Sequence, residues 1–275
     1  MALGLATRLA MNDGRGDPVV GLGVYAIPPG RPTREAVQAA LDAGYRHIDT
    51  ARLYGNEEDV GAAVRASGVP REEVFITTKV WNADHGYEAA LRAGEASLRR
   101  LGIGYIDLYL IHWPVPKLRG ETWRALVRLR EDGVCRSIGV SNYTIPHLEE
   151  LLATSDVVPA VNQVEFSPFL YQQGLLEFCR SRGILVEAYS PLTKGQRLGD
   201  PVLGSVARAH GRTPAQVLLR WGLQRGLVVL PKSARPARIR ENAALFDFEL
   251  PPADLARLDA LSEAYRTSWN PDGAP

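Results

Sequence analysis

The chain has 275 residues, of which 45% are hydrophobic and 23% are charged, so it can bury a large core and is neither a disordered chain nor a small disulfide scaffold. Its 32 lysines and arginines nearly balance its 31 aspartates and glutamates, and a formal charge of +1 argues against a nucleic-acid or anionic membrane partner. Both cysteines lie inside expected elements and no leader-like or membrane-spanning apolar run occurs, which predicts a soluble, cytoplasmic protein.

In chain order, a short hairpin is expected around Asn12, Asp13 and Gly14. After it, eight apolar runs of strand length alternate with amphipathic segments of helix length. The eight predicted strands are residues 19–25, 47–50, 74–80, 105–113, 136–142, 160–166, 184–190 and 227–233.

Several of the intervening helices carry clear start and stop signals. Residues 33–43 form a predicted helix that stops at Gly44. Asn56 is expected to cap the next helix, whose acidic first turn suits the helix dipole better than a metal. Thr213 and Gln216 form a predicted capping box that opens the helix before the last strand.

Eight strand–helix alternations without a low-complexity linker or a fixed-length repeat favour a closed (β/α)8 barrel over an open, doubly wound sheet. We therefore expect one α/β domain over residues 1–275, a TIM barrel whose bottom is closed by the N-terminal β-hairpin.

In such a barrel the chemistry lies at the rim where the strands end. Seven of the predicted strands end in, or carry, polar side chains at that point, which predicts a single site. They are Asp49 and Thr50, Lys79, His112, Ser141 and Asn142, Asn162 and Gln163, Tyr189 and Ser190, and Lys232 and Ser233.

Other familiar sites are excluded. Gly21, Gly23 and Ala26 fit the glycine pattern of a Rossmann turn, but Pro28 and Pro29 follow where the phosphate-binding helix would have to begin. The chain has no GxSxG nucleophile and no Tyr-xxx-Lys pair, and its histidines lack HxH and HExxH spacing, so no metal site is predicted.

The remaining rim residues suit proton donation: Asp49, Lys79 and His112 from three strand ends, and Tyr54 from the loop after the second strand. A tyrosine with its ordinary pKa of about 10 is a poor acid at neutral pH, and the ammonium of Lys79 is expected to lower that pKa. Asp49 would keep Lys79 protonated, and His112 could donate a hydrogen bond to a substrate carbonyl. The alternative is a structural Asp49–Lys79 ion pair with Tyr54 packed at the rim.

These residues lie in segments that resemble the signatures of a known family, the aldo-keto reductases. Residues 44–61 (GYRHIDTARLYGNEEDVG), 136–143 (RSIGVSNY) and 230–233 (LPKS) are similar to its first, central and cofactor signatures, in that order, and the resemblance covers essentially the whole chain. It implies a (β/α)8 barrel that binds NADPH across its rim, hydride transfer to a carbonyl, and Tyr54 as the general acid supported by the other three residues.

The resemblance also implies a cofactor site. Its nicotinamide end would be formed by Ser141, Asn142, Gln163 and the stacking Tyr189, and its pyrophosphate segment by Ser190 and Leu192. The residues implied around the 2′-phosphate and adenine are Lys232, Ser233, Arg235, Arg238, Glu241 and Asn242. Several cationic donors suit a dianion such as this phosphate. The alternative interpretation is that these residues only form the solvent-exposed start of a helix.

Within the family, the chain resembles short bacterial aldehyde and 2,5-diketo-D-gluconate reductases, whose last segment is brief, so an open substrate pocket is expected. The residues expected to line it are Tyr25, Trp81, His112, Trp113 and Trp269. Two positions depart from the family pattern: Ser167 stands where many members have histidine, and Tyr189–Ser190 replaces the Trp-Gly pair associated with diketogluconate reductases.

The predicted function is therefore NADPH-dependent reduction of small aldehydes and ketones, such as methylglyoxal or diketo sugar acids, by a monomer without a metal. Two alternatives are a non-catalytic barrel subunit that senses NADPH and a metal-dependent barrel hydrolase. The complete set of four rim residues favours catalysis, and the histidine spacing disfavours the hydrolase.

Overall fold

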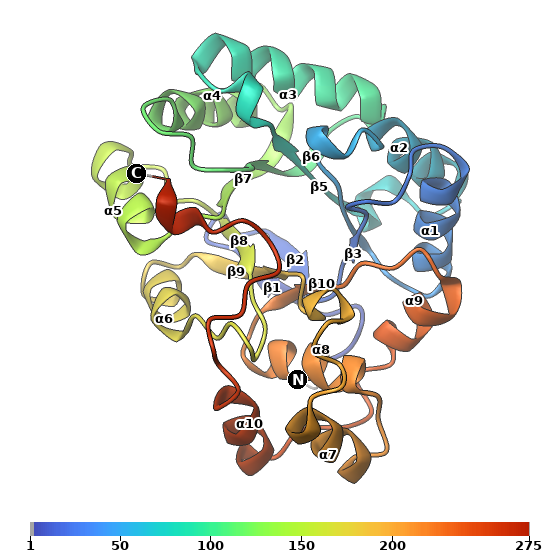
Figure 1. Ribbon diagram of the computed structural model, residues 1–275. Coiled ribbons are helices and arrows are strands. Elements are labelled where there is room, and N and C mark those ends of the chain that lie inside the picture. The colour runs from blue at the N-terminus through green and yellow to red at the C-terminus, as the bar shows by residue number, and fades with distance from the viewer. Residues whose placement is uncertain (1–2, 275) are drawn as a thin grey trace.

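The computed structural model describes residues 3–274 and is built around a sheet of eight parallel strands that curves into a barrel (Figure 1). The strands are β3 (Leu22–Gly23), β4 (His47–Asp49), β5 (Phe75–Val80), β6 (Ile106–Ile111), β7 (Cys135–Ser141), β8 (Val161–Glu165), β9 (Leu185–Tyr189) and β10 (Val228–Leu230). Each strand pairs in parallel with the next, and bridges from Val20 to Val229 and from Gly23 to Lys232 bring the last strand against the first. The predicted barrel and its eight strands are confirmed. Most of the strands are shorter than predicted, at one or both ends.

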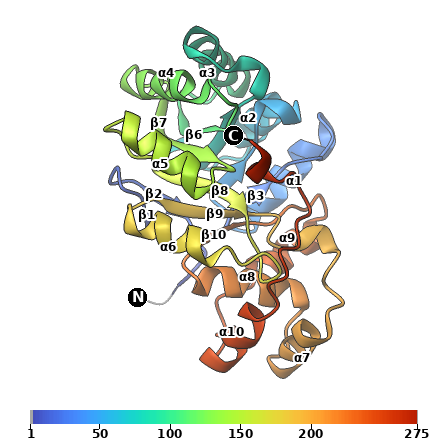
Figure 2. The ribbon, with the colours of Figure 1, turned by 60° about the vertical axis from the view of Figure 1, so that its left-hand side comes forward.

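Helices surround the barrel. In the described part of the chain they are α1 (Arg31–Asp42), α2 (Glu57–Ala66), α3 (Tyr87–Leu101), α4 (Arg119–Glu131), α5 (Ile145–Thr154), α6 (Gln173–Ser181), α7 (Pro201–Ala209), α8 (Pro214–Gln224), α9 (Pro236–Ala243) and α10 (Pro252–Asp259). The helices α7 and α10 are additions to the strand–helix alternation and lie together at one side of the molecule (Figure 2). No helix among these is long and apolar enough to cross a membrane.

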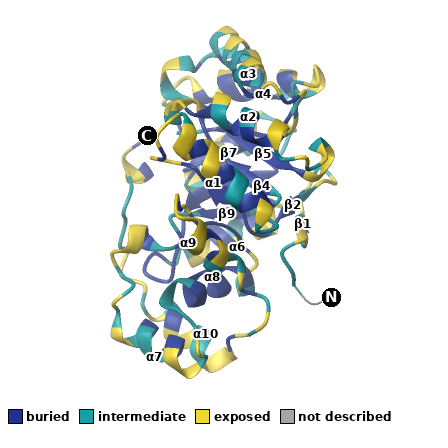
Figure 3. Ribbon diagram, turned by 90° about the vertical axis from the view of Figure 1, so that its right-hand side faces the viewer, coloured by how far each residue is buried: buried dark blue, intermediate teal, exposed yellow. Residues whose placement is uncertain are grey.

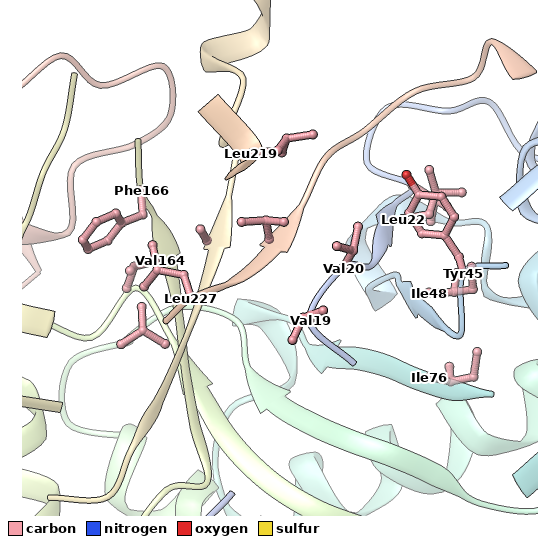
Figure 4. Packing of buried hydrophobic residues seen from close by; sticks show 14 of the residues in the cluster. Val19, Val20, Leu22, Tyr45, Ile48, Ile76, Val164, Phe166, Leu219 and Leu227 are labelled. Atoms are coloured by element: carbon pink, nitrogen blue, oxygen red, sulfur yellow. The ribbon is translucent and has the colours of Figure 1, made fainter. Parts of the chain in front are cut away.

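The strands are buried on both faces. Every residue of β5 and of β6 is buried, because side chains fill the barrel on one face and helices cover the other. Figure 3 shows buried strands inside helices whose outer residues are exposed. In Figure 4, Leu22, Tyr45 and Ile48 belong to one continuous cluster of buried side chains that also contains Val164 of β8 and Leu227, which directly precedes β10.

The N-terminal hairpin, β1 (Arg8–Ala10) and β2 (Gly16–Pro18), is antiparallel and closes the barrel at the amino-terminal end of the strands, as predicted. In the turn between these two strands, Asn12 Nδ2 donates to the carbonyl of Pro159, just before β8 begins, at 2.9 Å. Asp13 accepts a hydrogen bond from Ser137, near the start of β7, at 2.6 Å. The hairpin therefore covers the end of the barrel opposite the rim.

The two predicted helix caps have different outcomes. The capping box of α8 is confirmed, since the backbone N–H of Thr213 donates to Gln216 at 3.0 Å and the N–H of Gln216 donates back at 3.2 Å. Asn56 precedes α2, but the prediction that its side chain caps the helix is wrong. Its buried amide accepts from Thr50 at 2.7 Å and donates to the carbonyl of Val24 at 3.1 Å, because carbonyl groups of the neighbouring loop need a donor there.

We expect the contact between α2 and α3 to require glycine at position 61. A Cβ atom on Gly61 would lie 1.8 Å from the carbonyl oxygen of Leu101 at the end of α3, so Gly61→Ala must push the two helices apart. Urea denaturation should show a loss of about 2 kcal/mol or more in the free energy of unfolding. The control is Gly174→Ala in α6, where a Cβ meets nothing within 4 Å and stability should be kept or raised. Equal stability of the two variants would contradict this packing.

Candidate active site

A cavity of about 1070 Å³ lies at the rim where the barrel strands end. Its walls contain three of the four predicted catalytic residues, eleven of the twelve predicted cofactor residues and all five predicted substrate residues. The two exceptions are Lys79, which lies behind the wall, and Arg235, which is exposed beside it at the start of α9. The fold thus brings these distant segments to one place, as the strand-end pattern predicts.

Lys79 and Asp49 form a buried ion pair below the cavity. The side chain of Lys79 has no exposed surface, and its ammonium donates to both carboxylate oxygens of Asp49, at 2.8 and 2.7 Å, and to the carbonyl of Thr50 at 2.9 Å. All three ammonium hydrogens are therefore used. The predicted pairing is confirmed, and it fixes the cation 5.2 Å from the centre of the Tyr54 ring.

Tyr54 comes from a short 3-10 turn, η1 (Arg52–Tyr54), directly after β4. Burial, the carboxylate of Asp49 and the neighbouring Tyr25 raise the pKa of Tyr54 well above its ordinary value. The expectation that this pKa is lowered is therefore wrong for the protein alone, because burial disfavours the charged phenolate and the carboxylate of Asp49 adds to that effect. Tyr54 stays protonated and can donate its proton.

His112 stands beside Tyr54 and faces the same cavity. Its ring lies edge-on to Tyr54, with 5.8 Å between ring centres, and to Trp81, with 5.2 Å. Burial and the charge of Lys79 lower the pKa of His112 well below its ordinary value, so the imidazole is neutral. A neutral imidazole carries one N–H, which suits hydrogen-bond donation to an oxygen in the cavity.

Hydrogen bonds connect the ends of four neighbouring strands across the floor of the cavity. Asn142 donates to the carbonyl of His112 at 3.0 Å and accepts from the hydroxyl of Tyr189 at 2.8 Å. Ser141 donates to the backbone carbonyl of Gln163 at 2.8 Å. These bonds hold the four predicted nicotinamide contacts in one rigid surface.

Two of the rim residues have left-handed backbone conformations. Asn142 has a φ of 65° and Ser190 a φ of 48°. Such conformations are uncommon for residues with a Cβ atom, although asparagine adopts them more readily than most, and strained backbone of this kind is often found at functional sites. They turn the chain at the ends of β7 and β9 so that both side chains reach the cavity wall.

The C-terminal segment closes one side of the cavity, and its anchor is a residue that the sequence analysis missed. The segment runs from α10 across the rim to α5 (Figures 1 and 2). The carboxylate of Glu165, at the end of β8, accepts from the backbone N–H groups of Thr267 at 2.7 Å and Ser268 at 3.1 Å. This brings Trp269 to 5.9 Å from Trp113, ring centre to ring centre. The sequence feature that could have identified Glu165 is an acidic side chain at the end of an otherwise buried strand.

The opposite end of the cavity is cationic. Lys232 and Arg238 both line it, are exposed, and form no ion pair with the described residues. Glu241 is held by the hydroxyl of Thr213 at 2.7 Å, and Ser233 accepts from the backbone N–H of Arg235 at 3.1 Å. The two unpaired cations suit an anionic ligand.

Below the cavity lies a second buried cluster that spacing in the sequence did not predict. The carboxyl groups of Asp17 and Glu187 and the imidazole of His47 have no exposed surface, and their polar atoms lie within 4.8 Å of one another. Burial raises the pKa of Asp17 to about 7 and lowers that of His47. The cluster is linked to the rim because Gln163 donates to Glu187 at 2.6 Å.

Comparisons with known proteins agree with the geometry. The sequence profile described as the aldo/keto reductase family matches residues 28–263. A glyoxal reductase from Bacillus subtilis is 50% identical over 99% of both chains, and a morphine 6-dehydrogenase from Pseudomonas putida is 45% identical over 98% of this chain and 95% of its own. The crystal structure of an aldo/keto reductase from Brucella melitensis is similar with a TM-score of 0.90 and 47% identity, over 93% of this chain and 99% of that one.

Asp17 predicts a specific pH dependence of stability. Because its pKa is about 7 in the folded protein against an ordinary 3.8, the folded state holds its proton more tightly than the unfolded state. The stability it contributes is complete at low pH and is lost as the pH rises from about 4 through about 7. Asp17→Asn cannot lose a proton, so its free energy of unfolding should fall less than that of the unaltered protein between about pH 4.5 and about pH 8.

Urea denaturation across this pH range tests the expectation, with Asp13→Asn in the same hairpin as the control. Identical pH dependence of Asp17→Asn and the unaltered protein would show that folding does not change the protonation of Asp17.

Proposed function

The chain belongs to the aldo/keto reductase family, an oxidoreductase family that acts on carbonyl groups with a nicotinamide cofactor, and we propose that it reduces small aldehydes and ketones with NADPH. The observation that carries this proposal is the convergence of Tyr54, His112 and the Asp49–Lys79 ion pair beside one large cavity. We further propose Tyr54 as the general acid.

The donor set of the cavity fits NADPH. Lys232 and Arg238 are the groups that would bind the 2′-phosphate, because two exposed cations without partners favour a dianion over a neutral ribose hydroxyl. At the other end, the amide and hydroxyl groups of Ser141, Asn142 and Gln163 would hold the carboxamide. When bound, the reduced nicotinamide supplies the hydride that the carbonyl carbon accepts.

The residues of the chain supply the proton and its environment. The hydroxyl of Tyr54 donates its proton to the carbonyl oxygen as that oxygen becomes negative, and the neutral His112 donates a hydrogen bond to the same atom. As Tyr54 loses its proton, the ammonium of Lys79, 5.2 Å from the ring centre, stabilises the phenolate. Burial and the carboxylate of Asp49 thus keep the acid protonated before the reaction, and the ion pair keeps a cation near it during the reaction.

The substrate side of the cavity favours small aldehydes. Its walls are Tyr25, Trp81, Trp113 and Trp269, and 62% of the surface of Trp269 is exposed, so the pocket is aromatic and open. A dicarbonyl such as methylglyoxal suits these walls better than a diketo sugar acid, and the similar Bacillus subtilis protein is named glyoxal reductase. All groups of the site come from one chain, so we propose that a monomer is sufficient.

The variant Tyr54→Phe tests whether Tyr54 is the general acid. Phenylalanine keeps the ring but has no proton to donate, so kcat/KM for methylglyoxal should fall about 10²- to 10⁴-fold, while the Kd for NADPH measured by fluorescence titration stays nearly the same. Tyr25→Phe removes a neighbouring hydroxyl from the same cavity and should keep most of the activity. Undiminished turnover by Tyr54→Phe would exclude Tyr54 as the acid, and failure of the unaltered protein to reduce any carbonyl would favour a non-catalytic NADPH-binding role.

A double variant, Lys232→Ala with Arg238→Ala, tests the cofactor preference. Because both cations are proposed to bind the 2′-phosphate, the Kd for NADPH should rise at least about tenfold while the Kd for NADH changes little. Arg240→Ala, on the same helix but outside the cavity wall, is the control. Equal affinity of the unaltered protein for the two cofactors would contradict this assignment.

A further inference from the structure

The side-chain amide of Gln163 lies between two buried carboxyl groups. Its Nε2 is 2.8 Å from Asp49 Oδ2 and 2.6 Å from Glu187 Oε2. The carboxylate of Asp49, which is paired with Lys79, can only accept hydrogen bonds, so the NH2 group of the amide must face it, and the same nitrogen then also faces Glu187. The surroundings therefore fix which end of the amide is the donor and which is the acceptor.

The acceptor end of this amide is free to bind a ligand. Gln163 belongs to the cavity wall, and no described residue donates a hydrogen bond to its Oε1. The hydroxyl of Ser141 bonds the backbone carbonyl of Gln163 and not the side chain. Oε1 is thus an unpartnered acceptor in the part of the cavity proposed for the nicotinamide.

Glu187 is enclosed on its other side by buried polar groups. It lies on β9 directly opposite Gln163 in the pairing of β8 with β9, has no exposed surface, and is not part of the cavity wall. Its carboxyl group lies beside that of Asp17, with oxygen atoms of the two within 4.8 Å of each other, and Asp17 lies 3.0 Å from the imidazole of His47. If Glu187 carries a proton, that proton can be donated to Asp17, and the other oxygen still accepts from Gln163.

Asp49 alone would hold the amide less firmly. Both carboxylate oxygens of Asp49 already accept hydrogen bonds from Lys79, so Gln163 shares Oδ2 with an ammonium. The bond to Glu187 is shorter, at 2.6 Å, and comes from the neighbouring strand. The second acceptor therefore decides the direction in which Oε1 points.

We propose that Glu187 is a positioning residue for the cofactor: it holds the NH2 group of Gln163 so that Oε1 accepts a hydrogen bond from the NH2 group of the nicotinamide carboxamide. This inference rests on the proposed function, because it takes Gln163 as a nicotinamide contact. Holding the carboxamide limits rotation of the ring and so determines which of its faces lies toward Tyr54. Glu187 acts only through Gln163, and the hairpin residue Asp17 supports it from below.

The test compares two cofactors that differ at a single group. In the 3-acetylpyridine analogue of NADP+, a methyl group replaces the NH2 of the carboxamide, so the analogue cannot donate to Oε1. Glu187→Met keeps the length of the side chain but removes its acceptor, whereas Glu187→Gln can still accept from Gln163 and can donate to Asp17. Fluorescence titration gives the Kd of both cofactors for each protein, and thermal melting shows that each variant is folded.

The unaltered protein should bind NADP+ more tightly than the analogue by about five- to tenfold, the usual effect of one hydrogen bond. Glu187→Met should lose most of this preference, because only its binding of NADP+ becomes weaker, and Glu187→Gln should retain the preference. If Glu187 had only a structural role, Glu187→Met would weaken the binding of both cofactors equally. The same preference in Glu187→Met as in the unaltered protein overturns the inference.

A crystal structure of the unaltered protein with NADP+ tests the same point without any variant and decides it if Glu187→Met does not fold. Oε1 of Gln163 should lie within hydrogen-bonding distance of the carboxamide nitrogen while Nε2 remains on Glu187. A carboxamide bound elsewhere, or an amide turned the other way, overturns the inference. Failure of the unaltered protein to bind NADP+ at all would instead overturn the proposed function.

Discussion

Burying an ammonium and a carboxylate inside a barrel is costly, and Lys79 and Asp49 offset that cost by pairing on adjacent strands with every ammonium hydrogen used. Removing either partner would leave an unpaired buried charge. The pair also influences the protonation of its neighbours. Burial is the main reason why Tyr54 and His112 are neutral, and the charges add to it: Asp49 disfavours a phenolate at Tyr54, and Lys79 disfavours an imidazolium at His112. Burial and the ion pair together keep both side chains neutral and able to donate hydrogen to an oxygen in the cavity.

The same ion pair is the upper end of a chain of buried polar groups that passes through the barrel. Asp17 from the hairpin lies against Glu187 on β9, with oxygen atoms of the two within 4.8 Å of each other. Gln163 on β8 donates hydrogen bonds to Glu187 and to Asp49 on β4. Each contact joins elements that are distant in sequence. The hairpin that closes the bottom of the barrel thereby becomes part of the support for the rim, because buried polar groups remain stable only when their partners stay in place.

The two ends of the cavity differ in their physical character. The end proposed to hold the nicotinamide is largely buried, hydrogen-bonded and partly held in left-handed backbone conformations at Asn142 and Ser190. The end proposed to hold the adenine carries exposed cations at Lys232 and Arg238, whose attraction for a phosphate would be screened by salt. In the proposed function, orientation of the reacting ring would thus depend on rigid contacts, and affinity more on charge.

The sequence by itself determined the barrel and the place of the site. Apolar runs of strand length gave the strands, and polar residues such as Asp49 and Lys79 at their ends met at one rim, because parallel strands of a closed barrel all end on the same side. Only the tertiary structure decided the pKa of Tyr54, the anchoring of the C-terminal segment by Glu165, and the link between Glu187 and Gln163. Hydrophobic periodicity tells which face of a strand is buried, whereas these properties depend on which side chains meet across strands and how far water is excluded from them.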